Sequence, residues 1–279
     1  MLKSVVGLTL NVGLPSCRKG KAKVKKVLGF VGVAMATLLL VGCKDLKNKA
    51  SSELSKRLPF LKTEEVATVQ EGEELNWDIA TFPDYYAIEG ASGINESEFP
   101  ETGTIVYGEL DYLGRTTQAK GSLTFTNVEG SYGVRQKFGS DADPSGWQKQ
   151  EQKARIAHAN GKEYNGFFWN RSHLIGDALG GDAIRQNVIT GTRTQNVGQD
   201  SKGGMRYPEI KAQEWLESNQ TGVLYYGATP VYVGEELVPR YVEVAMKSSD
   251  GTIDEKVIVF NTANGYEINY LDGTFSAIE

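Results

Sequence analysis

The stretch Asn170-Arg171-Ser172-His173-Leu174-Ile175-Gly176 decides how this 279-residue sequence is interpreted, because it holds one of only two histidines. The aromatic-rich residues 164–169 before it predict a strand that runs into the stretch. Downstream, residues 187–198 read Asn-Val-Ile-Thr-Gly-Thr-Arg-Thr-Gln-Asn-Val-Gly, and Glu209 follows. An imidazole with a pKa of about 6.5 accepts a proton at neutral pH. His173 is therefore a candidate general base.

Each of these residues also has an ordinary structural explanation. A histidine beside an arginine is more often structural than catalytic. Asn187 and Asn196 suit turns or helix caps, and Glu209 falls in the first turn of an expected helix, where the helix dipole favours an acid. Their combination, in this order, is what points to chemistry.

Four further residues attract attention and are expected to be structural. His158 lies in an expected exposed turn, and Trp147 is expected to anchor the core. Asp177 and Asp182 flank Gly180-Gly181 and are expected to be loop acids rather than metal ligands.

The pattern resembles the DNA/RNA non-specific endonuclease family, whose active site is the ββα-metal motif, and most closely its secreted streptococcal-type nucleases. The likeness rests on Arg-Ser-His-Leu at 171–174, an asparagine fourteen residues after His173, a second asparagine nine further on, and a glutamate thirteen beyond that. Gly-Thr-Arg-x-Gln-Asn-Val-Gly at 191–198 adds to it. The likeness is strongest over 165–210 and extends over 77–279.

The resemblance implies a role for each matching position. His173 corresponds to the general base, and Asn196 to the sole direct protein ligand of a metal whose other positions are filled by water. Glu209 corresponds to the outer-shell acid that acts through metal-bound water. Asn187 corresponds to an asparagine that helps to hold the active-site water or substrate. Arg135 lies where family members place a catalytic arginine.

Three further basic residues are expected to face nucleic acid: Lys137 beside Arg135, Arg171 in the motif, and Arg193. Arg171 is expected to contribute structure and positive potential rather than chemistry. The commonest family motif is Asp-Arg-Gly-His, and Asn170 and Ser172 replace its first and third members. Because an amide supports an imidazolium less well than a carboxylate does, the exchange puts the orientation of His173 in question.

The implied reaction is metal-dependent hydrolysis of DNA and RNA without sequence preference. Mg²⁺ prefers oxygen ligands and keeps several waters, so one amide oxygen from Asn196 suffices, and Mn²⁺ is an alternative. Such a metal neutralises the phosphate and stabilises the leaving oxygen. Two other functions stay open: a DNA-capturing surface lipoprotein that has lost the chemistry, and a sequence-specific endonuclease of the HNH type.

The overall charge alone would not indicate a nucleic-acid partner. Residues 44–279 carry 23 basic and 35 acidic residues, a net charge of −12. Phosphate binding needs positive charge, so any such site must be a local patch. Residues 135–171 and 185–211 each have a net charge of +3 and are the two candidates.

The N-terminus is typical of an exported protein. Basic residues at 18–26 precede sixteen uncharged, apolar residues at 27–42, a length that suits a signal-peptide core better than a membrane span. Leu40-Val41-Gly42-Cys43 resembles a bacterial lipobox, which implies acylation of Cys43 and attachment to the membrane. An uncleaved signal anchor or a simple secretory signal are the alternatives. All three place the rest of the chain outside the cell. The oligomeric state is not indicated.

The remaining sequence predicts a linker over 44–75, with a short helix near Ser51 to Leu61, and a nuclease domain over 76–279. The expected strands cover 104–113, 118–126, 164–169, 222–233, 238–246 and 256–260, and the expected helix covers 206–218. That helix is expected to bury Tyr207, Ile210, Trp215 and Leu216. Asp250-Gly251, Asn264-Gly265 and Asp272-Gly273 indicate hairpins. The fold class is α+β, with a central antiparallel sheet, flanking helices and a ββα-metal motif.

Overall fold

The computed structural model describes residues 68–69, 76–148 and 152–279. All of them belong to the unit Phe60–Glu279. The expected signal segment 1–43 with its Cys43, nearly all of the expected linker, and the expected helix near Ser51 to Leu61 lie outside the described residues. None of the helices in the described ranges is long and apolar enough to cross a membrane.

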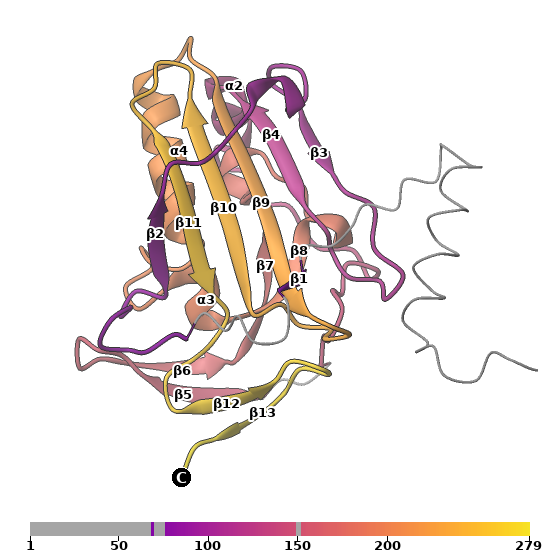
Figure 1. Ribbon diagram of the computed structural model, residues 1–279, viewed down its shortest axis with the longest axis vertical. Coiled ribbons are helices and arrows are strands. Elements are labelled where there is room, and N and C mark those ends of the chain that lie inside the picture. Colours follow the sequence, from indigo (N-terminus) through magenta and orange to yellow (C-terminus); the bar gives the residue numbers. More distant parts are fainter. Residues whose placement is uncertain (1–67, 70–75, 149–151) are drawn as a thin grey trace, which may run out of the picture. The chain divides into compact units, whose positions relative to one another are not determined.

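A seven-stranded sheet forms the frame of the fold (Figure 1). Six strands are antiparallel to their neighbours. In sheet order they are β2 (Tyr86–Gly90), β11 (Asp254–Phe260), β10 (Tyr241–Ser248), β9 (Leu224–Val233), β4 (Ala119–Leu123) and β3 (Ile105–Tyr107). The short β1 (Thr68–Val69), inside the expected linker, pairs in parallel with the end of β9. On β10, Val242, Val244 and Met246 are buried, as the two-residue period of a strand requires.

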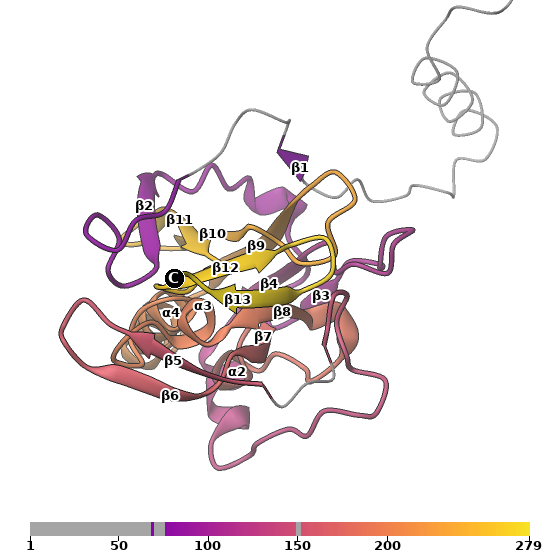
Figure 2. The same cartoon turned by 90° about the horizontal axis from the view of Figure 1, so that it is seen from below.

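The helices that shape the site pack with the buried face of this sheet. They are α2 (Phe125–Ser131), α3 (Arg193–Val197) and α4 (Arg206–Ser218), with the 3-10 turns η2 (Asp177–Leu179) and η3 (Arg185–Asn187). A further 3-10 turn, η1 (Glu96–Glu98), has no buried residue, and its Glu96 pairs with Lys247 of β10. Figure 2 shows α3 and α4 with β7 (Trp169–His173) and β8 (Val188–Thr192) on one side of the sheet. Leu174 after β7 and Leu216 of α4 share one hydrophobic cluster with Val242 and Val244.

Two small hairpins complete the fold. β5 (Lys153–Ala157) pairs with β6 (Glu163–Phe167), and β12 (Tyr266–Asn269) pairs with β13 (Thr274–Ala277). A second hydrophobic cluster joins them, in which the rings of Phe168 and Phe275 stack 3.7 Å apart. The indole of Trp169 donates to the carbonyl of Gly273 at 2.9 Å. This cluster fixes the start of β7, the strand that carries the histidine.

The predicted α+β class with a central antiparallel sheet is confirmed. The Asp250-Gly251 and Asp272-Gly273 turns join paired strands as predicted, whereas Asn264-Gly265 forms a turn between β11 and β12, which belong to different sheets. Residues 125–126, expected in a strand, begin α2, because Thr124 and Asn127 form a capping box there. β1, β2, β5, β8, β12 and β13 lie outside the predicted strand ranges.

Helix α4 has the predicted bounds but a different buried face. Leu216 is buried as expected, whereas Tyr207, Ile210 and Trp215 are only half-buried. Pro208, Glu209 and Ala212 are buried instead. A charged residue on the buried face of a helix needs a compensating partner, and Glu209 pairs with Arg206.

Candidate active site

The site is built on a strand–strand–helix unit. β7 and β8 pair antiparallel, with Trp169 opposite Thr192 and His173 opposite Val188. Helix α3 follows β8 without a linker, and the side chain of Thr192 caps it by accepting from the N–H of Gln195 at 2.9 Å. The unit therefore fixes the distance and orientation between the end of β7 and helix α3.

His173 is the last residue of β7 and its ring is held by an aromatic neighbour. The ring of Phe138 stacks on the imidazole at 5.1 Å. The Nε2 atom is buried and has no hydrogen-bond partner among the described residues. Burial lowers the pKa of His173 below its ordinary value; the carboxylate of Asp177 opposes this shift and the guanidinium of Arg135 adds to it. The imidazole is therefore neutral at pH 7.

Asn196, on α3, faces the two motif positions that depart from the common family pattern. The hydroxyl of Ser172 donates to its Oδ1 at 3.1 Å, and its Nδ2 donates to the Oδ1 of Asn170 at 3.2 Å. These even-numbered residues of β7 contact α3, whereas Arg171 and His173 contact Phe138. The two exchanged side chains therefore contact Asn196, whereas the imidazole of His173 contacts Phe138, and the effect of the exchange on the orientation of His173 stays a prediction.

Glu209 lies in the first turn of α4 and is 6% exposed. Its Oε2 accepts from Nη1 of Arg206 at 2.8 Å. Burial raises the pKa of this carboxyl, while the charge of Arg206 opposes the shift. The carboxylate lies so close to Gly176 that a Cβ on that residue would be 2.6 Å from its Cδ. The glycine after the histidine motif thus makes room for the acid.

His173, Asn196 and Glu209 line one cleft, with a volume of about 1020 Å³. Four arginines and the three acids Asp143, Asp177 and Glu209 line this cleft, so its net charge is +1 within an acidic chain. The lining residues that matter below are Arg135, Arg171, Arg193 and Arg206, the aromatic residues Trp147, Tyr164 and Phe167, and the acids Asp143 and Asp177.

The predicted basic residues are placed in different ways. Arg135 is exposed and lines the cleft, whereas Lys137 is exposed and outside the cleft lining. Arg171 donates from Nε to Asp143 at 3.0 Å and pairs with it through Nη2, so its charge is locally neutralised. Its guanidinium also lies 4.7 Å from the ring centre of Trp147. Arg171 thus ties the loop before β5 to β7.

Asn187 occupies a structural position rather than one open to the cleft. Its side chain is fully buried. The Oδ1 accepts from the N–H of Ile175 at 3.0 Å, and the Nδ2 donates to the carbonyls of Ile175 and Asp182, each at 2.9 Å. The expected contact with water or substrate does not fit this position, because main-chain groups already occupy the amide. Asn187 instead fixes the loop that follows His173.

Two site residues were not predicted, and one expectation about His158 is wrong. Asp177 was expected to be a loop acid, and Arg206 was not singled out, yet both line the cleft beside His173 and Glu209. Only one feature of the sequence could have indicated them: each lies three or four residues from a predicted site residue. His158 is buried rather than exposed, and it lies at the turn after β5, outside the cleft lining.

Comparison with known proteins agrees with this architecture. The family model for DNA/RNA non-specific endonuclease matches residues 94–250. A deoxyribonuclease of Streptococcus dysgalactiae subsp. equisimilis is 36% identical over 245 residues, covering 71% of this chain and 75% of the relative. The structure of Sda1 nuclease with bound zinc ion superposes with a TM-score of 0.69 at 39% identity, covering 73% of this chain and 100% of the other. NucA from Streptococcus agalactiae with magnesium ion bound shares the fold, at 22% identity and a TM-score of 0.54, covering 69% of this chain and 92% of the other.

The sheet-backed strand–strand–helix unit with its arginine-lined cleft, taken together with these relatives, defines the class of protein as a nuclease. The chain belongs to the DNA/RNA non-specific endonuclease family. It is an endonuclease, and the family resemblance drawn from the sequence is confirmed.

Proposed function

We propose that this chain is an exported, metal-dependent endonuclease that hydrolyses DNA and RNA without sequence preference. One observation carries the proposal. His173, Asn196 and Glu209 come from β7, α3 and α4, and all three line the same arginine-rich cleft. The deoxyribonuclease relative supports DNA as the substrate, and the family description supports both nucleic acids.

His173 acts as the general base in this proposal. A base must be unprotonated before the reaction, and burial keeps the imidazole neutral at pH 7. The stacked ring of Phe138 limits rotation of the imidazole. Asp177, which lines the cleft nearby, favours the protonated imidazolium once the proton has been taken from water. Burial therefore favours the neutral imidazole before the reaction, and Asp177 stabilises the imidazolium after it.

The donor set fits a hard divalent cation with a largely aqueous shell. No three His, Cys, Asp or Glu side chains of the described ranges converge as they do in a closed metal site. Asn196 would offer an amide oxygen directly, and Glu209 would contribute through water from its buried position beside Gly176. When bound, Mg²⁺ or Mn²⁺ supplies charge neutralisation at the phosphate and at the leaving oxygen. Sda1 nuclease was solved with a bound zinc ion, which supports a divalent cation as the cofactor.

The remaining arginines would hold the substrate by its backbone. Arg135 and Arg193 line the cleft, and a guanidinium pairs with phosphate through two parallel hydrogen bonds. Contacts to phosphate position a nucleic acid without reading its sequence. Sequence independence follows from such contacts. Arg171 contributes less to phosphate binding than expected, because Asp143 already pairs with it.

The N-terminal prediction completes the proposal. A lipobox ending at Cys43 would attach the enzyme to the outer side of the cell membrane, and cleavage or retention of the segment 1–43 by another route would leave it secreted or anchored. The substrates would then be extracellular nucleic acids. Labelling of growing cells with a radioactive fatty acid tests the lipid directly: label on the wild type and none on Cys43→Ser supports the lipoprotein.

Digestion of supercoiled plasmid tests the enzymatic proposal. The full chain, kept in solution with a mild non-ionic detergent, is incubated with Mg²⁺, with Mn²⁺ and with EDTA, and His173→Ala is treated in parallel. We expect a metal-dependent smear that is lost in EDTA and reduced by a factor of at least 100 in His173→Ala. Intact plasmid with both metals and a folded wild type would favour the DNA-capturing lipoprotein. Discrete bands would favour site-specific cleavage.

A further inference from the structure

We propose that the end of the cleft formed by Tyr164, Phe167 and Arg193 binds an unstacked base of the substrate, next to the phosphate that is cut. This inference rests on the proposed function and extends it, because it assigns a preference for nucleotides that are not held in a duplex. Phosphate contacts alone give no such preference.

The first part of this subsite is a guanidinium that an aromatic ring holds in place. The guanidinium of Arg193 lies over the ring of Tyr164, 5.2 Å from its centre. The Tyr164 hydroxyl donates to the carbonyl of Phe167 at 3.0 Å, so the ring lies along β6 instead of standing away from it. Gly166 permits this, because a Cβ there would be 2.6 Å from the Cζ of Tyr164. Tyr164 also packs against the second hydrophobic cluster, so its ring holds Arg193 in place before any ligand binds and leaves the stacking on a base to Phe167.

The second part is an aromatic side chain with no evident role in the core. Phe167 is 49% exposed, whereas its neighbours Phe168 and Trp169 are buried in the second hydrophobic cluster. Phe167 also lines the cleft. Lys153 of β5 lies directly opposite Phe167 in the register of the hairpin, and the ladder therefore places both on the same face. A cation beside an exposed ring suits a nucleotide, which has a flat base and an anionic phosphate.

The chemistry of this arrangement selects a base rather than another ligand. A base stacked on an aromatic side chain contributes about 1–3 kcal/mol, whatever its identity, since every base has a π-face. The guanidinium of Arg193 adds either a planar stacking surface or a phosphate contact. A base within a duplex is already stacked on both sides, so it reaches Phe167 only after leaving the stack. The subsite therefore favours single-stranded or locally opened nucleic acid.

Binding without cleavage tests this inference. A fluorescein-labelled oligothymidylate and an oligonucleotide of equal length with abasic positions have the same phosphates, but only the first has bases. The full chain is titrated against each in EDTA and the fluorescence anisotropy is read. We expect the abasic chain to bind the wild type more weakly by about 5- to 150-fold for each stacked base, the equivalent of 1–3 kcal/mol.

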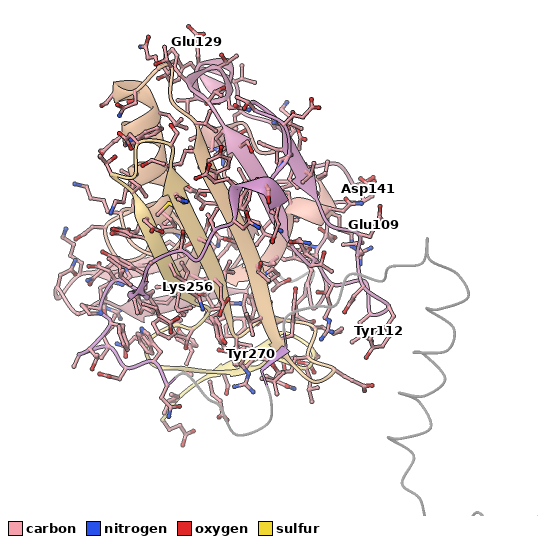
Figure 3. All side chains as sticks on the ribbon, turned by 45° about the horizontal axis from the view of Figure 1, so that its top comes forward. Glu109, Tyr112, Glu129, Asp141, Lys256 and Tyr270 are labelled. Carbon is pink, nitrogen blue, oxygen red and sulfur yellow. The ribbon has the colours of Figure 1, made fainter. Side chains whose placement is uncertain are left out.

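Three variants separate stacking from other effects. Phe167→Ala should bind the two oligonucleotides with equal affinity, and Phe167→Trp should keep the preference for bases. Tyr112→Ala is the matched control: Tyr112 is 81% exposed and projects from the loop between β3 and β4 (Figure 3), so its loss should change neither affinity. A Phe167→Ala protein that keeps the full preference, or a Phe167→Trp protein that loses it, would overturn the proposal.

The test distinguishes failure of this subsite from failure of the enzymatic proposal. A wild type that binds both oligonucleotides equally, yet digests plasmid in Mg²⁺, refutes the base subsite and leaves the nuclease in place. A wild type that prefers the oligonucleotide with bases but cuts nothing supports the subsite, and it refutes the enzymatic proposal. Because Phe167 is half exposed, its replacement is not expected to unfold the protein.

Discussion

Replacement of Gly176 by alanine tests whether the position of the Glu209 carboxylate matters for cleavage. The backbone of Gly176 has φ −65° and ψ 154°, a conformation that alanine adopts without strain. The added methyl group would lie 2.6 Å from the Cδ of Glu209. Carbon atoms pack at about 3.5 Å or more, so the carboxylate must move by about 1 Å.

A shift of that size is large for a catalytic site and small for the fold. A misplacement of about 1 Å costs a rate factor of roughly 100, which corresponds to about 2.7 kcal/mol in the activation barrier. Insertion of a methyl group into a packed region typically lowers stability by about 1–3 kcal/mol. We expect the low end of that range, because the atoms that must move belong to the end of a flexible side chain.

The assay is the initial rate of plasmid cleavage in Mg²⁺, read together with the thermal unfolding midpoint. Gly130→Ala is the matched control, since Gly130 lies in α2 and a Cβ there meets nothing within 4 Å among the described residues. It should leave the rate unchanged and raise stability by up to about 1 kcal/mol. Gly176→Ala with the wild-type rate would refute the role given to Glu209.

Two further predictions concern His173 and Asn187. Only the neutral imidazole accepts a proton, so activity should fall as the pH drops through the pKa of His173, which burial holds below 6.5. Because Asp177 raises this pKa and Arg135 lowers it, Asp177→Asn should move the acid limb of the kcat/KM profile to lower pH, and Arg135→Gln should move it to higher pH. If both variants moved the limb in the same direction, the assignment of His173 as the base would be contradicted. Asn187→Ala leaves two buried main-chain groups of Ile175 and the partly buried carbonyl of Asp182 without these partners. Each buried group costs about 1–3 kcal/mol, so urea unfolding should show a loss of roughly 3 kcal/mol, and a loss under about 1 kcal/mol would contradict the structural role.

His173 and Asn196, which the family resemblance singled out, are brought together by local chain geometry. His173 and Asn196 belong to two paired strands and the helix that follows directly, so their separation depends on one hairpin unit. Helix α4 was also predicted with its bounds, because its sequence has strong helix formers and ends before Asn219. In each case the residues that determine the structure are near neighbours in the chain.

The parts that the sequence did not predict depend on distant packing. The sequence cannot tell an asparagine that holds water from one that binds main-chain carbonyls. Asn187 binds main-chain carbonyls because the loop 175–182 folds against its side chain. The place of Arg206 in the cleft also depends on distant packing. The direction of its side chain follows from the face that α4 turns to the sheet. On that face Pro208, Glu209 and Ala212 are buried, in place of the aromatic residues that the hydrophobic pattern favoured. An aromatic residue such as Tyr207 stacks on Tyr86 at the edge of the core instead.

The turn between α3 and α4 explains how Asn196 and Glu209 come to line one cleft. They are thirteen residues apart, and in a continuous helix they would be separated by about 20 Å. Instead α3 ends at Val197 and the chain returns, so that the N–H of Met205 donates to the carbonyl of Gln195 at 2.8 Å. Gly204 makes this possible: it has φ 55°, and a Cβ there would be 2.6 Å from the carbonyl oxygen of Thr194. A glycine without any chemistry of its own therefore sets the distance between the two residues proposed to hold the metal.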